Sequence, residues 1–401
     1  MAKEIFDGIV RFEQVKGVGT MQVDFLPNQR VYTLIGENGV GKTKWLECLF
    51  TFLLLTSRVA RQVPSWVHLN ALPFKKIISP IGEESFTSSD VEEIPADLPS
   101  NSIDIPPDAL NFQWEHDRFS KFQHNWPIVY LAAQNRGNLR HVGDTIESMG
   151  NFQQRSKQYF GQLFSVLYHR ADDIKSLNMD TNIEEWIIQR AQSANPYQVK
   201  EDNRKVEIDT LLDLLNRIDK RIDKDFLEIS GSNRVFIKVE DKKTELSDLS
   251  SGFTSILKII QSIIAGYSYF TNEVQIANVR GVVLIDEIES HLHNEWQVKI
   301  VPLLKKLFPN TTFFITTHSS LVISQLEQGE AYRLQRSKDD GVVYGKVIDY
   351  PSQASFVDLL NEAFGVDLNS LKIQRAKERS QKEAKQALLD LVQRELGQQG
   401  E

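Results

Sequence analysis

The sequence predicts an α/β fold organised around a strand–loop–helix unit. Residues 31–35 form an apolar, β-prone run, residues 36–43 are rich in glycine, and residues 44–55 carry apolar side chains at helical spacing. Two further β-prone runs, 281–285 and 311–316, come far downstream, and each is followed by polar residues. Ligands bind at the carboxyl ends of strands in open α/β sheets, so we expect these polar residues to meet at one edge of a sheet.

The glycine-rich segment fits the phosphate-binding pattern G-x-x-x-x-G-K-[ST]. Glycines let backbone N–H groups turn toward phosphate oxygens, and both the following helix N-terminus and Lys42 add positive charge. Thr43 is placed to hold Mg²⁺ through its hydroxyl. The predicted nucleotide-binding residues here are Gly36, Asn38, Gly39, Gly41, Lys42 and Thr43. A glycine-rich turn without this function is the alternative, and the downstream motifs argue against it.

Asp286 and Glu287 follow the apolar run 281–285 directly. Asp286 is placed to hold the Mg²⁺ shell, directly or through water. Glu287 is placed to orient and polarise a water for attack on a γ-phosphate. Acidic residues also follow strands and cap helices without any catalytic role, so this assignment depends on the phosphate loop in the same chain.

Two weaker motifs surround the carboxylate pair in the sequence. Residues 249–253 precede a predicted helix that runs through Ile264, so Ser250 and Gly252 would present a hydroxyl and N–H donors to an anion. His318 lies just past the run 311–316, where a ring N–H can contact a γ-phosphate. An ordinary helix N-cap and an ordinary loop histidine are the alternatives, but the order of the motifs favours the functional interpretation.

As a set, these motifs resemble those of ABC-type ATPases of the SMC and RecF branch. Residues 36–43 are similar to the Walker A motif, 282–287 to Walker B, 249–253 to the signature motif L-S-G-G-[QE], and His318 to the switch histidine. Residues 289–293 resemble the D-loop segment E-x-H-L-H of a subgroup with short or missing coiled coils. That subgroup includes ATPase subunits of Septu-type anti-phage systems and the ATPase half of OLD-type nucleases.

The resemblance also implies further roles. The strand-like run 128–131 is followed by Gln134, which resembles the Q-loop glutamine that reaches Mg²⁺ and the attacking water. The implied catalytic residues are therefore Glu287, His318 and Gln134, and the implied metal ligands are Thr43, Gln134 and Asp286. Two residues depart from the signature: Ser251 replaces the first glycine and Phe253 replaces the usual polar residue, which alters the expected contacts to nucleotide.

The resemblance implies an ABC-type P-loop NTPase head with a mixed central sheet, an antiparallel N-terminal sheet and an inserted helical subdomain. Helical periodicity extends over 208–222, but no sustained heptads predict a long coiled coil. A hairpin is expected from 331–334 and 342–347. The expected segments are an ATPase lobe with Walker A (1–58), a Pro-rich insertion (59–127), a strand and Q-loop (128–149), a helical insertion (150–230), the signature, Walker B, D-loop and switch histidine (231–350), and C-terminal helices (351–401).

Composition limits the class of protein. The formal net charge of −8 gives no global basic field, so contact with nucleic acid, a candidate partner, would need a local patch. Residues 372–385 are rich in Lys and Arg, although a solvated charged helix is the commoner explanation of such a pattern. The single cysteine, Cys48, suits a reducing cytosol, and the longest apolar run is too short to span a membrane.

We therefore expect a cytoplasmic ATPase that uses ATP and Mg²⁺. In the resembled family, the signature helix of one protomer completes the ATP site of another, which implies a homodimer or higher oligomer formed on ATP. No effector chemistry is apparent in the chain, so a separate subunit such as a nuclease is the expected effector, with anti-phage defence as the expected process. A RecF-like DNA repair clamp and a slow-turnover, ATP-dependent scaffold are the alternatives. The long insertions and the E-x-H-L-H segment argue against a transporter subunit.

Overall fold

The computed structural model describes residues 6–62, 66–68, 72–86, 109–111, 121–134, 136, 146, 148–169, 174, 177–179, 182–365 and separate positions from 367 to 389. Its helices are α2 (Lys42–Thr56), α3 (Phe152–His169), α4 (Ile183–Gln192), α5 (Lys205–Ile218), α6 (Ser251–Ser268), α7 (Asn294–Leu307), α8 (Ser320–Ile323) and α9 (Phe356–Phe364). Its strands are β1 (Gly8–Val15), β2 (Gly19–Phe25), β3 (Val31–Ile35), β4 (Trp66–His68), β5 (Lys76–Ser79), β6 (Gly82–Ser85), β7 (Ala109–Asn111), β8 (Ile128–Leu131), β9 (Ile222–Ile229), β10 (Val235–Val239), β11 (Lys242–Glu245), β12 (Gly281–Ile285), β13 (Thr311–Thr316), β14 (Ala331–Arg336) and β15 (Val343–Val347).

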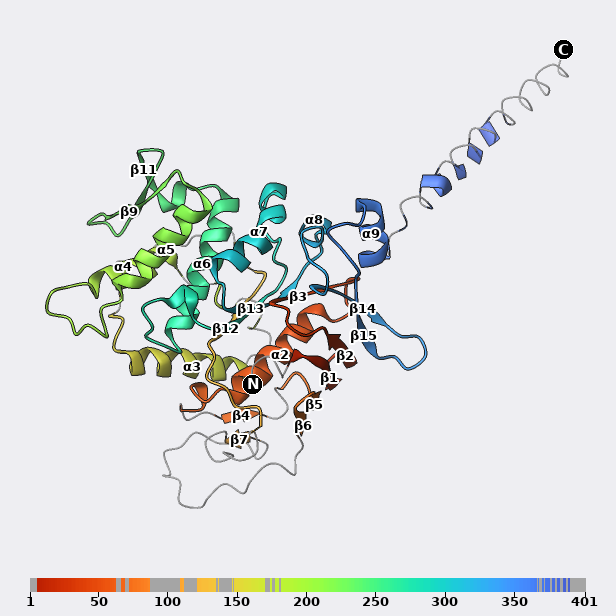
Figure 1. The fold of residues 1–401 in the computed structure, drawn as a ribbon, viewed down its shortest axis with the longest axis horizontal. Coiled ribbons are helices and arrows are strands. Elements are labelled where there is room, and N and C mark those ends of the chain that lie inside the picture. Colours follow the sequence, from red (N-terminus) through yellow and green to blue (C-terminus); the bar gives the residue numbers. More distant parts are fainter. Residues whose placement is uncertain are drawn as a thin grey trace, which may run out of the picture.

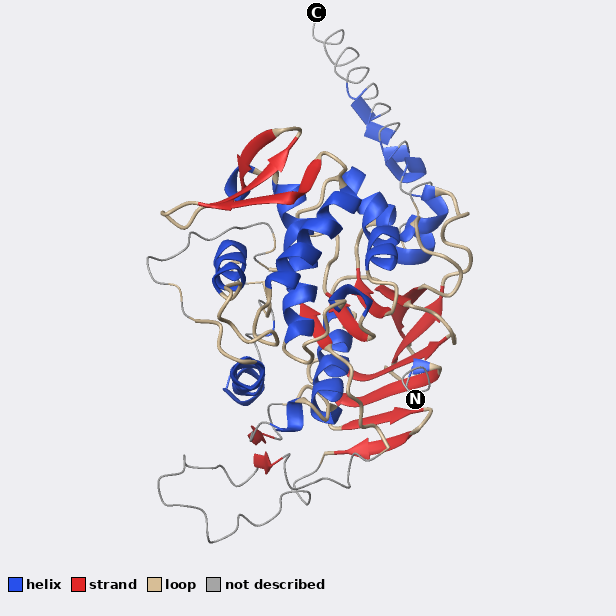
Figure 2. Cartoon of the chain, turned by 60° about the vertical axis from the view of Figure 1, so that its left-hand side comes forward, coloured by secondary structure: helices blue, strands red, loops and turns tan. Residues whose placement is uncertain are grey.

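The largest sheet is mixed and has ten strands, in the order β6-β5-β1-β2-β15-β14-β3-β13-β12-β8 (Figures 1 and 2). Strands β3, β13, β12 and β8 run parallel to one another. Every residue of β3, β12 and β8 is buried, as expected of parallel strands covered on both faces. Helix α2 packs on β8, β12 and β13, and α6 packs beside β8.

The N-terminal strands form the antiparallel part of the same sheet. Strand β1 pairs with β2 and β5, while β15 joins β2 in parallel and β14 joins β3 in parallel. The expected hairpin is confirmed, because β14 and β15 pair antiparallel across residues 337–342. With the helices described next, this arrangement confirms the predicted α/β fold class.

The helical insertion comprises α3, α4 and α5, which lie at the opposite end of the molecule from the β14–β15 hairpin (Figure 1). The helical periodicity predicted through Ile222 is wrong at its end. Helix α5 stops at Ile218, and Ile222 begins β9 in a three-stranded sheet of order β11-β10-β9. Asp219 ends the helix because its carboxylate accepts hydrogen bonds from the backbone and guanidinium of Arg221, which favours a turn over another helical residue.

The C-terminal region begins with α9, as predicted. Several of the basic residues between 372 and 385 occupy exposed helical positions: Lys372, Arg375, Lys377, Lys382 and Lys385. Arg379 lies outside the described residues, as does much of the Pro-rich insertion 59–127. None of the helices in the described part of the chain is both long and apolar enough to cross a lipid bilayer.

A buried carboxylate ties α4 to α5. Glu207 is fully buried, and it accepts hydrogen bonds from Arg190 at 3.0 Å and from Arg204 at 2.6 Å. Removing one partner from such a network leaves buried charge uncompensated, which destabilises more than the intact network stabilises.

We predict that Glu207→Gln lowers the free energy of unfolding by about 3–5 kcal/mol, since two buried guanidinium groups lose their carboxylate. Urea denaturation followed by circular dichroism measures this. Asp209→Asn is the matched control, because its pair with Lys205 on the same helix is exposed and such a pair contributes about 1 kcal/mol or less. Equal midpoints for the two variants would contradict the structural role of Glu207.

Candidate functional site

The phosphate-binding loop connects β3 to α2 and depends on its glycines. Gly36, Gly39 and Gly41 have positive φ values of 147°, 77° and 112°, which side-chain-bearing residues rarely adopt. A Cβ at Gly36 would lie 2.6 Å from the carbonyl oxygen of Leu334, so β14 allows only glycine there. Asn38, the remaining predicted residue of the loop, is exposed.

Lys42 is the charged residue of this loop. Its ammonium donates to the carbonyl oxygens of Gly36 at 2.9 Å and Glu37 at 3.0 Å. Burial lowers the pKa of Lys42, while the carboxylates of Asp286, Glu287 and Glu289 oppose that shift. Its cation therefore lies within electrostatic reach of the acidic residues that follow β12.

The Asp286 carboxylate is held between two threonine hydroxyls. Thr43 Oγ1 donates to Oδ1 at 3.0 Å and lies 3.1 Å from Oδ2, and Thr316 Oγ1 donates to Oδ1 at 2.6 Å. These residues come from α2, β12 and β13, so one carboxylate joins the three elements. Burial raises the pKa of Asp286, and the two threonine hydrogen bonds oppose the shift by stabilising the anion.

The Thr43 and Asp286 oxygens fit a Mg²⁺ ion. Magnesium prefers hard oxygen ligands, and adjacent ligands of its octahedron lie on the order of 3 Å apart. The 3.0 Å between Thr43 Oγ1 and Asp286 Oδ1 matches that spacing. Protein ligands that leave several positions of the octahedron open are typical of magnesium bound together with a phosphate. No group of three His, Cys, Asp or Glu side chains within the described residues could hold a metal without help.

Glu287 lies on a sharp turn directly after β12. Its φ is +46°, an uncommon value for glutamate, and its N–H donates to Thr316 Oγ1 at 2.7 Å. Its side-chain Oε2 accepts from Ser290 Oγ at 3.2 Å. The turn therefore directs the Glu287 side chain independently of Asp286, whose carboxylate faces the threonines.

Arg136 holds the backbone of this turn. It is fully buried and donates to the carbonyl oxygens of Glu287 at 2.7 Å, Asp286 at 2.8 Å and Ala132 at 2.8 Å. Burial lowers the pKa of Arg136 to about 10, so it stays charged at neutral pH. Its hydrogen bonds to described residues all go to carbonyl groups.

Glu289 positions the segment that contains His318. Its carboxylate accepts from Thr317 Oγ1 at 2.7 Å and from the His318 backbone N–H at 2.6 Å. The His318 ring lies parallel to the Phe364 ring of α9, with centroids 6.4 Å apart. Burial, followed by the nearby charge of Lys42, lowers the pKa of His318, so the ring is neutral at pH 7.

The signature segment forms the N-terminus of α6. Ser250 is its N-cap, and Ser250 Oγ accepts from the Phe253 N–H at 3.4 Å. A Cβ on Gly252 would lie 3.1 Å from the His293 ring, so α7 limits this position to a small residue. Phe253 is buried and packs edge-on against Trp296 of α7. The unusual Phe253 therefore fixes α6 against α7 within the chain.

Gln134 is exposed, three residues after β8 ends. Because Leu131 of β8 pairs with Ile285 of β12, this loop starts beside the carboxylate pair. The sequence missed the supporting roles of Thr316, Thr317 and Glu289. Two threonines directly after the apolar residues 313–315 were the available signal for the first two.

Comparisons with known proteins agree with the motifs. The family model described as "AAA domain, putative AbiEii toxin, Type IV TA system" matches residues 148–324. Septu protein PtuA of Bacillus mycoides is 25% identical over 92% of this chain, and that of Bacillus thuringiensis is 23% identical over 89%. This chain spans only 47% of the length of the first of these relatives, and 84% of the second.

Two further similarities are more limited. The probable ATPase of retron Ec83 from Escherichia coli is 37% identical to this chain over a region that makes up 22% of this chain and 17% of that protein. An Smc head bound to the C-winged helix domain of ScpA matches 86% of this chain and 99% of that chain, with 11% identity and a TM-score of 0.42. The resemblance drawn from the motifs is thus confirmed: this chain is similar to the Septu PtuA and retron ATPases, and it matches an AAA-type ATPase domain.

Proposed function

We propose that this chain binds and hydrolyses ATP with Mg²⁺ and that ATP joins two copies of it. One observation carries the proposal: three separate segments, which carry Lys42 and Thr43, Asp286 and Glu287, and His318, follow the carboxyl ends of β3, β12 and β13, and Thr43 bonds to Asp286. The mutual electrostatic influence of Lys42, His318 and the carboxylates supports their convergence. Phosphate needs a cation, a hard metal ion needs oxygen ligands, and an attacking water needs a base. ATP hydrolysis therefore needs these three kinds of group side by side.

Each residue has a distinct role in this proposal. The loop N–H groups and Lys42 bind the β- and γ-phosphates, while Thr43 and Asp286, with Gln134 as a third candidate, hold the metal. When bound, Mg²⁺ would neutralise the charge that develops on the phosphoryl oxygens. Glu287 accepts the proton of the attacking water, and neutral His318 donates a ring N–H toward the γ-phosphate.

An ATP site shared between two protomers gives Ser250 a role. Ser250 caps α6, so its hydroxyl and the N-terminal N–H groups of α6 suit the γ-phosphate of an ATP held by a second protomer. ADP lacks that phosphate, so hydrolysis would release the pair. The similarity to Septu PtuA proteins supports a role in anti-phage defence, with a separate subunit such as a nuclease as the effector that this ATPase gates in the cytoplasm.

We predict that Glu287→Gln slows steady-state phosphate release by about 100-fold or more, because an amide cannot take the proton of the water. ATP binding should persist, and size-exclusion chromatography with ATP should show a longer-lived dimer. Glu295→Gln is the control, since Glu295 is an exposed glutamate on α7. A turnover equal to that of the control would contradict the role of Glu287, and a monomer with ATP bound would contradict the dimer.

We predict that Lys42→Ala weakens ATP binding by about tenfold or more, because the loop loses its charge-assisted contact to phosphate. Isothermal titration with ATP at fixed ionic strength measures the affinity. Lys299→Ala, which removes an exposed lysine from α7, controls for the change in net charge. Unchanged affinity in the Lys42 variant would refute the assigned phosphate loop.

A further inference from the structure

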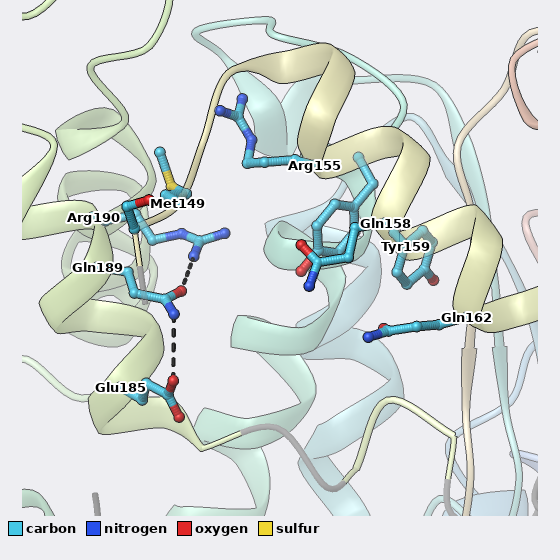
Figure 3. A pocket seen from close by; sticks show the side chains of 10 residues that line it. Met149, Arg155, Gln158, Tyr159, Gln162, Glu185, Gln189 and Arg190 are labelled. Atoms are coloured by element: carbon cyan, nitrogen blue, oxygen red, sulfur yellow. Dashed lines mark hydrogen bonds between the residues drawn. The ribbon is translucent and has the colours of Figure 1, made fainter. Parts of the chain in front are cut away.

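A polar cavity of about 250 Å³ lies between α3 and α4, away from the phosphate-binding loop (Figure 3). Gln158 and Gln162 of α3 point across the cavity toward Gln189 and Arg190 of α4. The described residues that line it are Ser148, Met149, Arg155, Gln158, Tyr159, Gln162, Glu185, Gln189, Arg190 and Tyr269. The arginines are buried, whereas Gln158 and Gln162 are exposed, so the cavity has a cationic inner wall and an amide rim.

Arg155 is a buried cation with only neutral partners. It is 3% exposed, and it donates to the Gly150 carbonyl at 2.9 Å and to the Asn272 side-chain oxygen at 3.0 Å. Its Nε has no hydrogen-bond partner, and no carboxylate within the described part of the chain lies at ion-pair distance from it. Burying an uncompensated charge is costly, so proteins normally supply a counter-ion.

The charged residues around Arg155 give it no bonded counter-ion in the described part of the chain. Glu207 is the nearby buried carboxylate, and both of its oxygens are already bonded, to Arg190 and Arg204. Of the three buried guanidinium groups, only those of Arg190 and Arg204 therefore bond directly to this carboxylate. Burial lowers the pKa of Arg155; Glu207 opposes the shift, and the charges of Arg204 and Arg190 add to it.

We propose that this cavity binds a small phosphate ester no larger than a mononucleotide, with its phosphate on Arg155 and Arg190. Guanidinium groups bind phosphate through paired hydrogen bonds, and an anion here would supply the missing counter-charge. The three glutamine amides offer both donors and acceptors, and Glu185 accepts from a hydroxyl or N–H group of the ligand.

The direct test is binding to a chain whose phosphate loop is disabled. Isothermal titration of the full chain carrying Lys42→Ala is run with 5′-AMP, 5′-GMP, 5′-CMP, 5′-UMP, glucose 6-phosphate and inorganic phosphate. We expect saturable binding of at least one ester, tighter than that of inorganic phosphate. Ester binding is measured without ATP hydrolysis. A failure to bind esters would therefore leave the proposed ATPase function standing, and a failure to hydrolyse ATP would leave the proposed ester site standing.

Variants then locate the site. In the Lys42→Ala chain, Arg155→Gln should weaken the ester by about tenfold or more and Gln158→Leu by several-fold, because each removes a contact from the cavity wall. Lys157→Gln removes an exposed lysine between them without altering the cavity, so it should leave binding unchanged. Gln158 is exposed and uncharged, so the Gln158 variant should fold. It therefore tests the site even if the Arg155 variant does not fold.

Stability gives an independent readout. Arg155→Gln removes a buried charge that has no counter-ion among the described residues, so the ligand-free melting temperature should be retained or raised. No binding by any of the six probes, or inorganic phosphate bound as tightly as every ester, would overturn the proposal. Equal weakening by Lys157→Gln and Arg155→Gln would do so too, because it would reflect net charge alone.

Discussion

A buried carboxylate held between two threonine hydroxyls is the interaction on which the candidate site depends. Asp286 bonds to Thr43 at the start of α2 and to Thr316 at the end of β13. Because a carboxylate is costly to bury without partners, these bonds constrain the ends of three elements at once. The parallel register supports them, since Ile285 of β12 pairs with Ile315 and Thr316 pairs with Leu34 of β3. A shift of one residue in either pairing would turn Thr316 away from Asp286.

The charged residues around Asp286 stabilise the turn after β12 and the loop beside it. Arg136 brings a buried positive charge behind the acidic turn and binds its carbonyl groups, which stabilises the left-handed backbone of Glu287. Glu289 secures the segment that carries His318. Asp286 thus links the elements and Glu289 orders the neighbouring loop, while Glu287 is the residue that we propose for catalysis. The cavity between α3 and α4 is different, because among the described residues there the buried cations outnumber the carboxylates that bind them.

The sequence predicted features with a strong local pattern. The strands β3, β8, β12 and β13, the α2 helix and the β14–β15 hairpin were all recognisable from apolar runs and turn residues. The end of α5 was not, because the apolar spacing continued to Ile222 while Asp219 formed a competing turn with Arg221. Roles that arise from long-range contacts were also hidden. The bonds of Arg136 to carbonyls some 150 positions away and the packing of Phe253 on Trp296 depend on the tertiary fold.

The most direct test of the central claim is the dependence of nucleotide affinity on magnesium in an Asp286→Asn chain. Affinity for ATP is measured by equilibrium titration with Mg²⁺ and again with EDTA, in the variant and in the unmodified chain. If Asp286 and Thr43 together hold the metal, Mg²⁺ should tighten ATP binding by about tenfold or more in the unmodified chain and hardly at all in the variant. An Asp286→Asn chain that keeps the full magnesium effect would contradict the account.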